Sequence, residues 1–99
     1  MIQSIITVDG STSWFQLEDV GNIHIAVKGT WGGGSLTIEQ RINGSAYAIQ
    51  NSADVVITHT ANFNRHVSFE KHDTFRLTLT GATNPSLDYS IAGHFGTVS

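Results

Sequence analysis

Apolar and polar residues alternate along most of this 99-residue chain. The alternation is clearest at 22–28, 74–80 and 87–91, where every second residue is apolar: Ile23, Ile25, Val27, Phe75, Leu77, Leu79, Leu87, Tyr89 and Ile91. Successive side chains of a strand point to opposite faces of its sheet, so this pattern predicts strands with one buried face. No segment of helical length carries apolar residues at intervals of three and four. We therefore predict an all-β fold.

One dipeptide predicts both a hairpin and its register. Asn43-Gly44 is the preferred pair for a two-residue type I′ turn, because both residues of that turn need a positive φ. The turn pairs Ile42 with Ser45 and places six residues on one face of the hairpin: Leu36, Ile38, Gln40, Ile42, Tyr47 and Ile49. Further turns are predicted at Asp9-Gly10, at Gly32-Gly33-Gly34 and at Asn84-Pro85.

These signals predict nine short strands, at 2–8, 13–17, 22–29, 35–42, 45–50, 54–60, 66–71, 74–80 and 87–94. Short strands with turn signals every ~8–12 residues are typical of sandwiches. We predict a single antiparallel β-sandwich of jelly-roll or immunoglobulin-like type over residues 1–99. The terminal segments 1–8 and 93–99 are predicted to act as arms that pair with neighbouring subunits.

The composition narrows the classes of function. Charged residues make up 13% of the chain, against roughly 25% in a typical domain, and the net charge is −3. Polarity comes instead from eleven Thr, ten Ser and six Asn. The absence of a basic patch argues against nucleic-acid binding, and the absence of cysteine excludes disulfides and thiolate metal sites. A neutral, hydroxyl-rich surface repels its own copies only weakly, which suits a protein that works in an assembly.

No membrane or export segment is predicted. No apolar run approaches the ~20 residues that span a bilayer, so we expect no membrane partner. The start of the chain, 1–6, lacks the basic flank and the long apolar stretch of a signal peptide. We therefore expect synthesis and assembly in a cytoplasm.

The titratable residues predict little chemistry. If Val67 points inward, then His66, Glu70 and His72 share an outer strand face and could ligate zinc, although a solvated face is the simpler interpretation. There is no G-x-S-x-G nucleophile elbow, and Glu18-Asp19 is most simply a solvated turn. We predict no catalytic residue, no metal and no cofactor.

Two tryptophans and the glycine run are the candidate contact elements. Trp31 stands immediately before the three glycines, in a predicted loop, where interface and core are equally good interpretations. An exposed tryptophan can anchor a subunit or stack on a sugar ring. Trp14 is predicted to be a half-buried core aromatic. The glycines join two predicted strands, so they are not a phosphate-binding loop.

The order of two motifs resembles a group of small virion proteins of tailed bacteriophages. The first motif is Gly29-Thr30-Trp31-Gly32-Gly33-Gly34-Ser35-Leu36-Thr37-Ile38, and the second is Phe75-Arg76-Leu77-Thr78-Leu79-Thr80-Gly81-Ala82-Thr83-Asn84-Pro85-Ser86. The resemblance covers 20–91 and implies a β-sandwich that serves as a capsid decoration (cement) protein, a head fibre, or a tail or neck accessory. Such components are usually homotrimers. The sequence departs from the family pattern in its longer and more polar 51–65 segment and in His72-Asp73.

The leading hypothesis is therefore a non-catalytic phage capsid decoration protein that binds the outer shell as a homotrimer, with itself and the major capsid protein or neighbouring virion proteins as partners. The residues predicted to make the contacts are Trp31, Gly32, Gly33, Gly34, Ile2 and Ile5. The alternative is a tail, neck or fibre accessory, with a carbohydrate-binding module that uses Trp31 or Trp14. A small metal enzyme built on His66, Glu70 and His72 is the weakest hypothesis.

Overall fold

A computed structural model describes residues 2–17, 21–50, 53, 55–69, 73–93 and 95–97. Within these ranges the chain is all-β and contains no helix, so none that could cross a membrane. Its eleven strands are β1 (Ile2–Ile6), β2 (Gly10–Ser11), β3 (Phe15–Leu17), β4 (Gly21–Thr30), β5 (Ser35–Ile42), β6 (Ser45–Ala48), β7 (Thr58–His59), β8 (Phe63–Phe69), β9 (Thr74–Thr80), β10 (Ser86–Ala92) and β11 (Phe95–Thr97).

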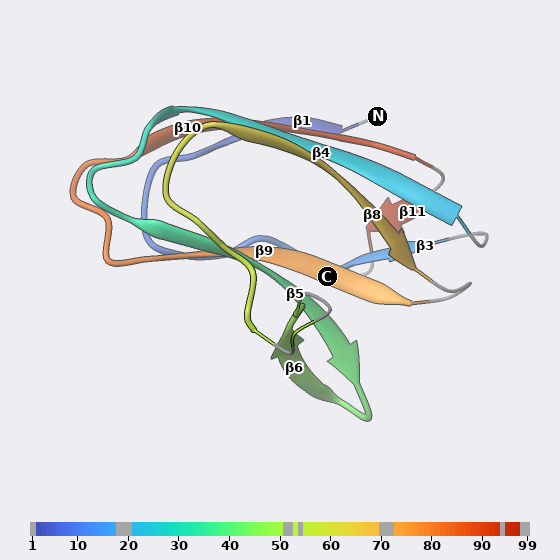
Figure 1. Ribbon diagram of the computed structural model, residues 1–99. Coiled ribbons are helices and arrows are strands. Elements are labelled where there is room, and N and C mark those ends of the chain that lie inside the picture. The colour runs from blue at the N-terminus through green and yellow to red at the C-terminus, as the bar shows by residue number, and fades with distance from the viewer. Residues whose placement is uncertain are drawn as a thin grey trace.

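The strands form two antiparallel sheets that pack face to face as a sandwich (Figure 1). The first sheet has the order β1-β10-β4-β8, and the second has the order β11-β3-β9-β5-β6. The short β2 and β7 pair with β9 and β5 of the second sheet. Strands β1 and β8 are therefore the opposite edges of the first sheet.

The core lies between the two sheets and confirms the alternation seen in the sequence. Strands β4 and β10 of the first sheet face β3, β5 and β9 of the second. The buried apolar side chains are Phe15, Leu17, Ile23, Ile25, Val27, Leu36, Ile38, Phe75, Leu77, Leu79, Leu87, Tyr89 and Ile91. Each of these five strands buries one of its two faces, which leaves mainly polar side chains on the outer faces of the sandwich.

The hairpin turn and its register are confirmed. Asn43 and Gly44 have φ angles of 52° and 81°, and Ile42 lies opposite Ser45. The hairpin projects beyond the region where the two sheets overlap (Figure 1). Tyr47, on β6, is therefore 55% exposed although it lies opposite the half-buried Gln40.

Strand boundaries depart from the prediction between residues 50 and 70. Only Thr58–His59 and an isolated bridge from Gln50 to Val56 form in place of the predicted strand 54–60. Strand β8 begins at Phe63, three residues before its predicted start. A half-buried arginine, Arg65, stands between Phe63 and Val67 on the inward side of β8. That charged residue interrupts the alternation of apolar and polar residues. The alternation therefore does not predict the first half of the strand.

The two segments predicted as arms pair within the chain. Strand β1 pairs with β10 along its whole length, from Ile2 opposite Ile91 to Ile6 opposite Leu87. Strand β11 pairs with β3 at the end of the second sheet. Each segment is thus an edge strand of its own sandwich. Residues 1, 94 and 98–99 of the predicted arms lie outside the described residues.

Candidate functional site

Trp31 is a half-buried side chain that is held from within the chain. Its indole Nε1 donates a hydrogen bond to Asn62 Oδ1 at 3.0 Å, and the same oxygen accepts the Gly29 backbone N–H at 3.0 Å. The indole ring also lies 6.3 Å from the ring of Phe63. The site therefore joins the end of β4 to the start of β8, so the ring position reflects internal packing.

The glycine run forms a tight turn that packs against the β9–β10 loop. Gly32 and Gly33 have φ angles of 58° and 77°, and Gly34 N–H donates to Trp31 O at 2.9 Å. The backbone of Thr83 approaches so closely that a Cβ on Gly32 would lie 2.1 Å from its carbonyl oxygen. A glycine is therefore required at position 32 by contacts within the chain. Whether this turn also contacts a neighbouring subunit stays a prediction.

Trp14 lies on the outer face of the second sheet rather than in the core. The guanidinium carbons of Arg41 and Arg76 lie 4.9 Å and 4.4 Å from the centroid of its ring. Such cation–π contacts contribute ~0.5–1 kcal/mol at exposed sites. A sugar ring could use this face of Trp14 only by displacing an arginine.

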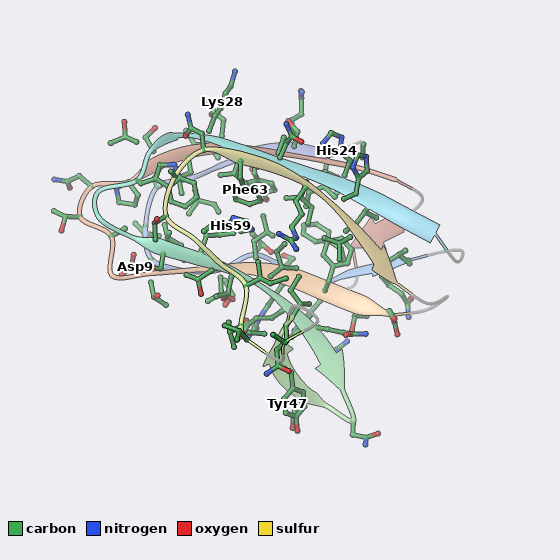
Figure 2. The ribbon with its side chains drawn as sticks, viewed as in Figure 1. Asp9, His24, Lys28, Tyr47, His59 and Phe63 are labelled. Carbon is green, nitrogen blue, oxygen red and sulfur yellow. The ribbon has the colours of Figure 1, made fainter. Side chains whose placement is uncertain are left out.

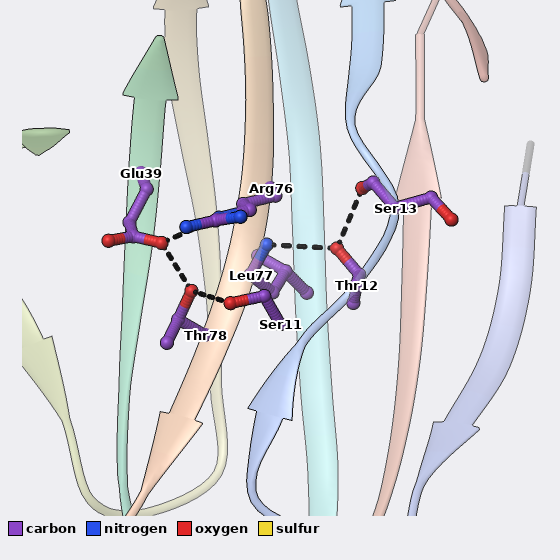
Figure 3. Close-up of polar contacts among 7 residues, drawn as sticks. All are labelled: Ser11, Thr12, Ser13, Glu39, Arg76, Leu77 and Thr78. Carbon is purple, nitrogen blue, oxygen red and sulfur yellow. Dashed lines mark hydrogen bonds and ion pairs between the residues drawn. The ribbon is translucent and has the colours of Figure 1, made fainter. Parts of the chain in front are cut away.

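A hydrogen-bonded network continues across the same outer face (Figure 3). Glu39 Oε1 accepts a bond from Arg76 Nε at 2.8 Å and a second bond from the Thr78 hydroxyl. The Thr78 hydroxyl lies 2.8 Å from the hydroxyl of Ser11 on β2. Burial raises the pKa of Glu39, but the bonds from Thr78 and Arg76 outweigh that effect and hold the pKa below its ordinary value. The network ties three strands together by polar contacts.

Three histidines lie in the described ranges, His24 and His66 on the first sheet and His59 on β7 of the second. His24 and His66 stack on the outer face with ring centroids 4.3 Å apart, and His24 Nε2 lies 3.3 Å from Asn64 Oδ1. No group of three or more His, Asp or Glu side chains in the described ranges is close enough to hold a metal ion. Glu70 and His72 of the predicted zinc ligands lie outside the described residues.

A concave site of about 790 Å³ lies between β6 and β8, and we call it the β6–β8 groove. Tyr47 and Val56, which are 55% and 43% exposed, contribute apolar surface to it, and the half-buried Arg65 contributes a positive charge. Its lining residues are Gln40, Ala46, Tyr47, Ala48, Ile49, Gln50, Val56, Ile57, Arg65, His66 and Val67.

A second, smaller depression of about 250 Å³ lies at the opposite edge of the first sheet; we call it the β1–β2 surface. Ile5 and Val8 are 51% and 70% exposed there. The carboxylate of Asp9 accepts the backbone N–H groups of Gly81 and Ala82 at 3.0 Å each. The depression is lined by Ile5, Ile6, Thr7, Val8, Asp9, Gly10, Ser11, Thr12 and Tyr89.

The structure thus divides the predicted contact residues. Ile5 is exposed on the β1–β2 surface, whereas Ile2 is half-buried against the core. Trp31 and the glycines lie elsewhere, at the ends of β4 and β5. The exposed Tyr47 and Val56 were not among the predicted residues. For Val56 the signal in the sequence was the apolar Val55-Val56 pair within a polar segment.

Comparisons with known proteins add no family to this picture. No protein-family model, no curated protein and no solved structure matches the chain.

Proposed function

We propose that this chain is a non-catalytic structural protein of a tailed-phage virion, a homotrimeric decoration protein that binds the outer capsid shell. The observation that carries the proposal is the distribution of its surface. Large exposed apolar side chains in the described part of the chain occur at two edges of the sandwich, while the broad outer faces carry mainly polar and charged residues. That distribution suits a subunit which contacts its neighbours through its edges.

The outer face of the first sheet is an example of this polar character. Ser90 and Asp88 of β10 point outward opposite Ala26 and Lys28 of β4. Such a face mixes hydroxyl groups with few charges, so its contact with a protein shell carries a smaller desolvation penalty than that of a densely charged surface.

The open edges of the sandwich support the same function. Strands β1 and β8 each pair on one side within the described part of the chain. An unpaired edge invites association with another chain, and few charges on β1 and β8 oppose it. Contacts of ~800 Å² per partner are enough for stable attachment of a subunit of this size. The resemblance to small virion proteins supplies the shell as the partner.

The experiment is cryo-electron microscopy of the virion whose genome encodes this chain. The expected result is a trimeric density of matching shape on the outer shell, and its loss in particles assembled without the gene. A location in the tail, the neck or a fibre would replace the decoration function with the accessory function. Particles that lack the protein altogether by mass spectrometry would disprove a virion role.

A further inference from the structure

We propose that the trimer is a ring with head-to-tail contacts, in which the exposed side chains of Ile5 and Val8 on the β1–β2 surface of one copy dock in the β6–β8 groove of the next. This inference rests on the homotrimer of the proposed function and identifies the two surfaces that hold it together. The named occupant of the groove is a second copy of this chain.

The first observation is where the exposed apolar side chains lie. The described residues include five large apolar side chains that are exposed. Tyr47 and Val56 line the β6–β8 groove, Val55 precedes Val56 in the chain, and Ile5 and Val8 line the β1–β2 surface. The clustering matters because scattered apolar residues are ordinary, whereas grouped ones mark a contact surface.

The second observation is the charge of the two surfaces. Arg65 and His66 line the groove together with no carboxylate, and Asp9 lines the β1–β2 surface together with no cationic side chain. Arg65 is half-buried and forms no ion pair with any residue in the described ranges. Asp9 already accepts two backbone N–H groups, but a carboxylate has room for further donors. The two surfaces are therefore complementary in charge as well as in apolar character.

The third observation is the position of the two surfaces in the fold. β1 and β8 are opposite edges of the first sheet, and Figure 2 shows Asp9 and Tyr47 at different extremities of the molecule. A twofold dimer brings one patch against its own copy, whereas two different patches that fit each other make a heterologous contact. Repeated around an axis, a heterologous contact closes into a ring, and three copies is the number that the proposed function requires.

The test alters each surface separately. One variant carries Tyr47→Asp with Val56→Asn, and the other carries Ile5→Asn with Val8→Asn. All four side chains are more than two-fifths exposed, so the subunit should still fold. Thr30→Asn, at an exposed position that lines neither surface, is the matched control. Sedimentation velocity should show trimers for the wild type and the control. For each double variant we expect the dissociation constant to rise at least about tenfold, which gives monomers.

Mixing the two double variants distinguishes a head-to-tail contact from a contact between two copies of the same surface. In the mixture, the groove variant still has an unaltered β1–β2 surface, and the other variant still has an unaltered groove. The expected result is a one-to-one pair that neither variant forms alone. If two copies of the same surface contacted each other, association would instead be lost in only one of the two double variants.

Several outcomes would overturn the inference. If both double variants stay trimeric, the ring is held by other surfaces, and the virion function is untouched because particle imaging tests it separately. If the wild type is monomeric at millimolar concentration, then the groove takes another occupant, such as a glycan or a shell protein. If the mixture yields no pair, the two surfaces do not fit each other.

Discussion

The imidazole of His59 stacks on the ring of Phe63 between the two sheets, with ring centroids 3.6 Å apart and planes 7° apart (Figure 2). The Nε2 atom of His59 is buried and has no hydrogen-bond partner among the described residues. Burial, together with the nearby positive charge of Arg65, lowers the pKa of His59 below its ordinary 6.5. The stacked pair thus contains a histidine that the fold keeps neutral.

We predict that this histidine makes the fold acid-sensitive. Above pH 6.5 the ring is neutral in both the folded and the unfolded chain, so it leaves the stability unchanged. As the pH falls below 6.5, the unfolded chain binds a proton that the folded chain resists, and the free energy of unfolding decreases. Urea unfolding between about pH 7.5 and pH 5.5 measures this decrease.

His59→Phe keeps a flat ring on Phe63 and removes the titration, so the decrease over that range should become smaller. An equal pH dependence in wild type and His59→Phe would assign the effect to other groups.

We predict that Glu39 also makes the free energy of unfolding depend on pH, in a lower pH range than His59 does. Its pKa is below the ordinary 4.5, so its charged form stabilises the fold above that pH. This contribution disappears as the pH falls below 4.5 and through the lower pKa of the folded state. Glu39→Gln should reduce the free energy of unfolding at neutral pH by about 1 kcal/mol, because the bond from Arg76 loses its charge assistance. It should also flatten the pH dependence in acid, and Asp88→Asn on an exposed site is the control.

Asn62 is predicted to hold the Trp31 region through one oxygen atom. Asn62→Ala removes the acceptor of the Gly29 and Trp31 N–H groups and should cost about 1–2 kcal/mol of unfolding free energy. Asn62→Asp keeps an acceptor in place and should cost less. Chemical denaturation followed by tryptophan fluorescence measures both, and an equal loss in the two variants would refute the role of the oxygen.

The two central glycines of the turn should respond differently to the same substitution. At Gly33 an added Cβ meets open space, so Gly33→Ala carries only the strain of a positive φ, about 1–2 kcal/mol. At Gly32 the Cβ also collides with the backbone of Thr83, so Gly32→Ala should be clearly more destabilising. Thermal unfolding of the pair compares them directly. Similar melting temperatures would mean that the β9–β10 loop yields to the added methyl group.

Strand pattern and turn chemistry were predictable because they are local. The alternation around Ile25 and Leu77 and the Asn43-Gly44 turn each act over a few residues, and all three appear in the structure as expected. The start of β8 was not predictable, because Arg65 occupies an inward position that a pattern search expects to be apolar.

The contact surfaces were less predictable because exposure depends on where the sheets stop overlapping. Tyr47 follows the apolar pattern of its hairpin, yet it lies beyond the opposing sheet and is exposed. Trp31 was ambiguous for a related reason. Its half-buried state depends on Asn62, which is distant in sequence and joins it only in the folded chain.

The pairing of β1 with β10 sets the order in which this chain can fold during translation. Ile2 lies opposite Ile91, so β1 has its partner only after β10 has also left the ribosome. Synthesis of ~100 residues takes about 5–20 s, and during that time the apolar β1 has no neighbour in its own sheet. A fold built from such distant pairings forms slowly. Messages cut short before β10 should therefore yield chains that cannot complete the first sheet and are exposed to proteases and aggregation.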